Sequence, residues 1–173
     1  MYLETFQQMQ KMLGSMDAWL VAAEAHAKGR AFDPKNYLSQ RLAPDQFPLV
    51  QQVQIACDSA KLGAARVSGK EAPSFPDDED SIEKLRERVA KTRAFLGGLS
   101  AADFAAASTR VVSLPRWEGK TMTAANYFAE YAVPNFYFHL THVYAILRHN
   151  GVGLGKRDYL GTLSFDAPSG AKA

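Results

Sequence analysis

Apolar residues recur along most of the chain at alternating spacings of three and four, which is the period of a helix with one buried face. The clearest stripe begins at Tyr2 and ends before Gly29. Glycine is a natural helix stop because it readily adopts the backbone conformations that end a helix. Three further stretches show the same period. The predicted helices cover residues 2–28, 44–69, 81–98 and 122–150.

Four long helices with short connections are typical of an all-α four-helix bundle. Pro44 can stand in the first turn of the second helix, where the missing N–H is tolerated. Pro134 is expected to kink or interrupt the last helix. Between Ser108 and Lys120, β-branched residues on both sides of a proline predict a short hairpin or irregular excursion. Residues 151–173 are predicted to form a C-terminal loop, and the whole chain one domain.

Composition narrows the class of protein. The chain has 173 residues, of which 47% are hydrophobic and 22% charged, and its net charge of +2 is too small to indicate nucleic-acid binding. No run approaches eighteen apolar residues, so we expect no membrane span. The first residues lack the features of a signal peptide. Cys57 is the single cysteine, which excludes an intrachain disulfide. We therefore expect a cytoplasmic protein.

Three of the four histidines fall in one stretch, FYFHLTHVYAILRHNG, over residues 136–151. His139 and His142 are three apart on a helix, so both could reach one ion or one substrate. His149 lies seven residues beyond His142, roughly 10 Å along the axis, and suits the negative end of the helix dipole. Two interpretations of His139 and His142 stay open: hydrogen-bonded residues at the bundle edge, or parts of a site.

The second predicted helix is apolar almost all round, yet Gln51, Gln54 and Asp58 share one stripe. They either line a narrow solvated groove or face the histidines inside the bundle, where sites in such folds are built. In the second case His139, His142 and Asp58 are the candidate catalytic residues. The remaining candidate pocket residues are Gln51, Gln54, Asn135 from the histidine stripe, and Tyr144 from the adjoining apolar face.

Two segments carry a resemblance to a known family. RLAPDQFPLVQQVQIACDSAKLGAARVSG and NFYFHLTHVYAILRHNGVGLGKRDYLG resemble an uncharacterised bacterial domain-of-unknown-function family related to the DinB/YfiT-like superfamily. The resemblance implies a four-helix bundle that is often dimeric. The superfamily includes proteins assigned as metalloenzymes and thiol-dependent transferases. Their usual metal site takes one histidine from the second helix and two, in an H-x-x-x-H spacing, from the fourth.

This chain departs from that pattern. His139 matches the first fourth-helix ligand, but Val143 stands where the second histidine belongs, and His142 comes one place early. The second-helix position falls near Gln54. Zinc or nickel on three histidines needs converging imidazoles, which valine and glutamine do not supply. We therefore predict that the ancestral metal site is lost, and that His139, His142 and Asp58 are the only weak candidates for a divalent metal.

Three functional hypotheses follow. The first is a small-molecule pocket with His139 and His142 as hydrogen-bonding groups or a general base, oriented by Asp58. The second is a non-catalytic dimeric stress or binding protein whose histidines are structural. The third is a metal-dependent enzyme of thiol-transferase type. We expect a homodimer, a possible small-molecule ligand, and neither nucleic acid nor membrane as partner.

Overall fold

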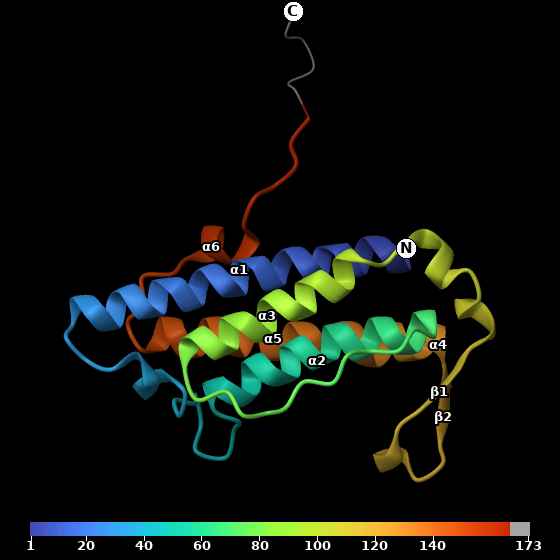
Figure 1. The fold of residues 1–173 in the computed structure, drawn as a ribbon, viewed down its shortest axis with the longest axis horizontal. Helices are drawn as coiled ribbons and strands as arrows, with labels where there is room; N and C mark the ends of the chain where they lie inside the picture. Colours follow the sequence, from blue (N-terminus) through green and yellow to red (C-terminus); the bar gives the residue numbers. More distant parts are fainter. Residues whose placement is uncertain (167–173) are drawn as a thin grey trace, which may run out of the picture.

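The computed structural model of the protein describes residues 1–166 and has the predicted all-α architecture. Four helices run side by side, with the connection over residues 30–48 at one end and a small hairpin at the other (Figure 1). Around the bundle their order is α1, α3, α2, α5. Their bounds are Tyr2–Gly29 for α1, Leu49–Ser68 for α2, Ile82–Gly97 for α3 and Val133–His149 for α5.

The apolar stripe of α1 is buried as its spacing predicts. The large side chains of this stripe from Phe6 to Leu20 are at most 1% exposed, so the burial of each contributes about 1.5–3 kcal/mol to stability. Trp19 joins them, fully buried beside Tyr144 and Tyr159. The buried residues of the α1 stripe are Phe6, Met9, Leu13, Met16, Leu20, Ala23 and Ala27.

The second helix begins at Leu49, five residues later than predicted. Pro48 is its N-cap in an extended conformation, and a residue before proline is disfavoured in helical geometry, so the helix cannot continue back through Phe47. Residues 44–47 form a loop instead. The guanidinium of Arg41 organises this loop by donating to the backbone oxygens of Pro44 and Gln46, both at 3.3 Å.

The predicted hairpin is present. Strands β1 (Val111–Ser113) and β2 (Thr121–Thr123) pair antiparallel, with Val112 opposite Met122. The predicted helix over 122–150 starts after this hairpin as α4 (Ala124–Asn126) and continues through a π-helical segment over Tyr127–Ala132 into α5. Pro134 is the second residue of α5, separated from the end of the π segment by one residue. Proline lacks the backbone N–H that would bond to the preceding turn, and the wider π turn lies at that place. The interruption expected at Pro134 is therefore a local change of helical pitch.

Residues 151–166 are not only a loop, because they contain the short helix α6 (Lys156–Leu160). The indole Nε1 of Trp19 donates to the backbone oxygen of Asp158 at 3.0 Å, and Tyr159 stacks on the same ring. These contacts hold α6 against α1. The rest of the predicted loop, 167–173, lies outside the described residues. No helix in residues 1–166 is both long enough and apolar enough to cross a membrane.

Candidate functional site

A cavity of about 480 Å³ lies between the 44–47 loop, the first turn of α2 and the first half of α5. This size is in the range of small-molecule pockets. Three of the predicted site residues, Asn135, His139 and His142, lie in its wall. The lining residues are Asp45, Gln46, Phe47, Gln52, Asn135, Phe138, His139 and His142.

His139 is held in one tautomer by its neighbours. Its Nδ1 lies 2.7 Å from Gln52 Oε1, and Gln52 Nε2 lies 3.0 Å from the backbone oxygen of Phe47. Because a backbone oxygen only accepts, the Gln52 amide nitrogen must face Phe47, which turns its oxygen toward His139. His139 Nδ1 is therefore the protonated nitrogen. Its Nε2 carries the lone pair and has no hydrogen-bond partner within the described structure.

Burial keeps His139 uncharged. The residue is only 6% exposed, and desolvation, with a smaller contribution from nearby His142, lowers its pKa from 6.5 to about 4. A neutral imidazole with this pKa is a poor proton acceptor at neutral pH but a good hydrogen-bond acceptor. Within the cavity, His139 thus presents a fixed lone pair.

His142 lies half-buried at the mouth of the cavity. Its Nδ1 donates to the backbone oxygen of Phe138 at 2.7 Å, so Nε2 is the acceptor in the neutral ring. The Phe138 ring packs against it with centroids 4.2 Å apart. Asn135 Nδ2 donates to Ser59 Oγ at 2.7 Å, which leaves its Oδ1 as a further acceptor. Phe47 and Phe138 are 51% and 55% exposed and flank the opening.

The structure does not bring Gln54 and Asp58 to the histidines, so that part of the predicted site needs correction. Asp58 Oδ1 pairs with Arg88 at 3.0 Å and Lys61 at 3.1 Å, and Gln54 Nε2 donates to Glu79 at 2.7 Å. Both face α3 and the linker that precedes it. The correction has a simple cause: α2 packs on both α3 and α5, and these side chains lie on its α3 side.

Two other predicted pocket residues also lie outside this cavity. Gln51 is exposed and lines a neighbouring surface cleft on the far side of the 44–47 loop. Tyr144 packs against Trp19 and Tyr159, with ring centroids 5.5 and 5.6 Å apart, on the side of α5 that faces α1 and α6. Neither side chain lines the histidine cavity.

Gln52, which fixes the tautomer of His139, is a cavity residue that the sequence analysis missed. It shares one face of α2 with Ser59 and Gly63. Ser59 bonds Asn135 of α5, and a Cβ on Gly63 would lie 3.2 Å from that of Ala132, the last residue of the π segment before α5. The sequence carried a signal for this face: three small or polar residues stand at spacings of seven and four on a helix otherwise rich in apolar residues. The cavity residues of the 44–47 loop could not be found, because that segment was predicted to be helical.

A three-ligand metal site does not fit these residues. The α2 position next to His139 is Gln52, whose oxygen and nitrogen are both engaged, and Val143 has no donor atom. Asp58, the remaining candidate, is held by Arg88 and Lys61. The described residues contain no group of three His, Cys, Asp or Glu side chains placed to hold a metal ion. Only His139 and His142 remain of the predicted ligand set, two donors where zinc sites use at least three.

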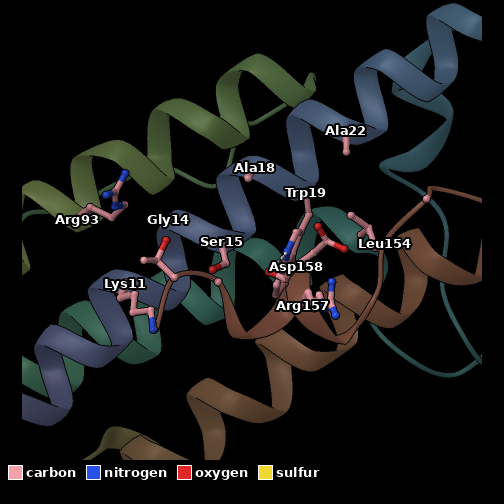
Figure 2. Close-up of a pocket in the computed structure, with 13 residues that line it drawn as sticks. Lys11, Gly14, Ser15, Ala18, Trp19, Ala22, Arg93, Leu154, Arg157 and Asp158 are labelled. Atoms are coloured by element: carbon pink, nitrogen blue, oxygen red, sulfur yellow. Dashed lines mark hydrogen bonds between the residues drawn. The ribbon is translucent and has the colours of Figure 1, made fainter. Parts of the chain in front are cut away.

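A larger cleft, of about 650 Å³, lies between α1, α3 and the segment around α6. Figure 2 shows Ser15 and Trp19 of α1 on the side of Arg157 and Asp158, with Lys11 farther along α1 and Arg93 of α3 beyond Gly14. Arg93 and Arg157 are exposed, and the polar contacts of Trp19 and Asp158 hold α6 in place. The cleft lacks histidine, so the stronger candidate site is the histidine cavity.

The comparisons with known proteins agree with this architecture. Residues 1–160 match the family model described as a domain of unknown function, DUF1993. The crystal structure of a DinB family member protein from Shewanella denitrificans is 48% identical and superimposes with a TM-score of 0.90, covering 94% of this chain and 93% of that one. No protein of curated function is detectably similar in sequence. With a family match over nearly its whole length and a DinB relative of the same fold, the chain belongs to the DUF1993 family of DinB-like proteins.

Proposed function

We propose that this protein binds a small organic molecule in the histidine cavity, with His139 as the residue that accepts a hydrogen bond from the ligand. One observation carries the proposal: a buried, neutral histidine whose tautomer is fixed by Gln52 and whose free Nε2 belongs to a cavity-lining side chain. Within residues 1–166, Nε2 is not among the buried atoms that lack a partner, so it is open to the cavity, where a ligand donor can reach its lone pair.

The two histidines have different roles in this proposal. His139, with its pKa of about 4, binds and orients the ligand. His142 lies at the more open mouth and is the residue placed to exchange a proton with bound ligand or solvent. Asp58, which the sequence suggested as an orienting partner, is replaced in that role by Gln52 for His139 and by the Phe138 carbonyl for His142.

A fragment screen by ligand-observed NMR tests the proposal. Fragments that bind the wild type are expected to lose binding in His139→Leu and to keep it in His149→Leu, the matched change at the far end of α5. Folding of each variant is checked by circular dichroism, and His142→Gln serves as a second cavity variant. Hits that are insensitive to both cavity variants, or no hits at all, would contradict the proposal.

We also propose that the pocket works without a metal, against the alternative of a metal-dependent thiol-transferase-like enzyme. Two observations support this proposal. Gln52 and Asp58 already bind other groups of the protein, and the Val143 side chain has no atom that could bind a metal. Elemental analysis of protein purified without a histidine tag is expected to find well under one zinc or nickel per chain. Stoichiometric metal that disappears in His139→Leu would favour the enzyme alternative instead.

Two further properties concern the assembly of the protein and its place in the cell. We infer a homodimer, as the family resemblance implies, and a cytoplasmic location. The single cysteine, Cys57, is fully buried, and desolvation raises the pKa of its thiol to about 12, which suits a protein that needs no oxidising compartment. Sedimentation equilibrium is expected to give twice the 19.0 kDa chain mass. A monomer at micromolar concentration would contradict the dimer.

A further inference from the structure

We propose that the ligand of the histidine cavity is a small organic ammonium ion with a flat apolar body, rather than a carboxylate or a phosphate. The inference rests on the proposed function and adds the chemical class of the ligand. The ammonium would donate to His139 and His142 near Asp45, while its apolar body lies between Phe47 and Phe138.

The hydrogen-bonding atoms of the α5 wall are acceptors. Both histidines use Nδ1 as a donor within the protein, to Gln52 Oε1 and to the Phe138 backbone oxygen, so each has only Nε2 left. Asn135 uses its amide nitrogen on Ser59 and leaves Oδ1. Both ends of the Gln52 amide are already engaged: its nitrogen donates to the backbone oxygen of Phe47, and its oxygen accepts from His139 Nδ1. Each amide nitrogen keeps a second N–H, but the two imidazole lone pairs and Asn135 Oδ1 make acceptors the more numerous, so a ligand that donates hydrogen bonds suits this wall. An ammonium group has up to three N–H donors.

Charge favours a cation. Among residues 1–166, neither lysine nor arginine lines the cavity, and Asp45 is the one formally charged residue of its wall. The basic residue nearest in sequence to the 44–47 loop, Arg41, donates to the Pro44 and Gln46 backbone oxygens and lines the neighbouring cleft instead. A carboxylate or phosphate would meet imidazole lone pairs and a carboxylate without a compensating positive charge, which makes its desolvation unfavourable.

The loop wall supplies a second acceptor and an aromatic surface. Gln46 Oε1 is buried without a hydrogen-bond partner in the described part of the chain, so a ligand donor that reaches this oxygen would satisfy it. Phe47 and Phe138 remain about half exposed at the opening, although large aromatic side chains usually bury more of their surface. Aromatic faces beside a cation site are typical of ammonium recognition, through cation–π attraction.

Three probes of similar size and different charge test the inference: 2-phenylethylammonium, 2-phenylethanol and 3-phenylpropanoate. Binding is followed by backbone amide shifts of α5 and the 44–47 loop in two-dimensional NMR. We expect the ammonium to bind about tenfold more tightly than the alcohol, because hydrogen bonds from a charged donor are roughly twice as strong as neutral ones. The propanoate is expected not to shift these residues.

Variants sharpen the test. Asp45→Asn is expected to weaken the ammonium roughly two- to fivefold, as for an exposed ion pair, and to leave the alcohol unchanged. Glu118→Gln, an exposed acid on the distant hairpin, is the matched control and is expected to change neither. Asp45 lies in an exposed loop, so its variant is expected to keep the wild-type melting temperature.

Each contrary result has a distinct meaning. Propanoate binding at these residues as tightly as the ammonium would overturn the ligand class and leave the pocket function standing. The same holds if the ammonium shifts only residues outside the cavity, or if a zinc titration occupies both histidines more tightly than the ammonium does. Failure of every probe and every screening fragment to reach the cavity would overturn the proposed function as well.

Discussion

At the scale of single residues, the state of His139 is decided by two neighbours rather than by its helix. Gln52 sets which ring nitrogen carries the proton, and burial sets the charge. A histidine fixed in this way is a hydrogen-bond acceptor at any pH near neutrality. His149, on the same helix, has no side-chain hydrogen-bond partner in the described structure and lies in the last turn of α5, beside the negative end of the helix dipole.

The first prediction concerns stability against pH. Because the pKa of His139 is about 4 in the folded protein and 6.5 ordinarily, the unfolded chain binds a proton between these values that the folded chain does not. The contribution of His139 is full above pH 6.5 and is lost as the pH falls toward 4. From about pH 7.5 to about pH 5, the free energy of unfolding should fall by roughly 2 kcal/mol through this residue.

Urea denaturation of the wild type and of His139→Gln at both pH values measures this contribution. The variant cannot titrate at this position, so the difference between the two pH dependences isolates His139 from every other group. Equal pH dependences would show that the histidine is protonated or exposed in the folded protein.

The second prediction compares the loss of stability from replacing Gln52 with the loss from replacing its sequence neighbour Gln51. Gln52→Leu leaves His139 Nδ1 and the Phe47 backbone oxygen without partners, which should lower the free energy of unfolding by about 1–3 kcal/mol. Gln51→Leu, at an exposed position, should change it by less than about 0.5 kcal/mol. Imidazole nitrogen NMR should in addition show a mixed His139 tautomer only in Gln52→Leu.

At the scale of elements, the linker between α2 and α3 is tied down by one buried arginine. The Arg88 side chain is 1% exposed and pairs with Asp58, Asp77 and Glu79 at 2.9–3.0 Å. It also donates to the backbone oxygen of Pro76 at 3.1 Å. The proline-rich acidic linker is thereby fastened along the α2–α3 face, although its composition alone indicates only a surface connection.

The third prediction follows from this tether. Arg88→Met removes the counter-charge of Glu79, which is 7% exposed, and should lower the free energy of unfolding by about 3–5 kcal/mol. Limited proteolysis should then cut within residues 70–81. Arg86→Met, two residues earlier and paired with Asp17 at the surface, should cost at most about 1 kcal/mol. Similar losses from both changes would mean that Arg88 is not the tether.

At the scale of the whole molecule, the two ends of the described chain depend on each other. α1 packs on α3, α5 and α6, and its Trp19 is covered by Tyr144 of α5 and Tyr159 of α6. Residues far apart in sequence therefore share one core. Such a bundle should lose all its helices together rather than one end first.

The fourth prediction is a single cooperative unfolding transition. With Trp117→Phe, fluorescence reports on Trp19 alone, because the chain has two tryptophans. The urea midpoint from this fluorescence should coincide with the midpoint from helical circular dichroism. An earlier fluorescence midpoint would mean that α6 detaches before the bundle unfolds.

Part of the candidate site was predictable, and particular residues show where prediction stops. His139, His142 and Asn135 share one face of a single helix, so their spacing alone brought them together. Asp45, Gln46 and Phe47 were hidden because helix periodicity continued back to Pro44, while the local effect of Pro48 on the residue before it ended the helix sooner. Helix boundaries near proline thus depend on one residue, and the loop there forms a wall of the cavity.

By itself, the sequence determined the four helices, the hairpin and the histidine stripe, because these follow from periodicity and residue identity along a short stretch of chain. Only the tertiary structure decided which side of α2 meets α5. A helix that packs on two others has apolar residues on most sides, so its own pattern does not say which neighbour each side faces. This packing arrangement is why His139 forms its hydrogen bond with Gln52, and why Asp58 pairs with Arg88 and does not reach the histidines.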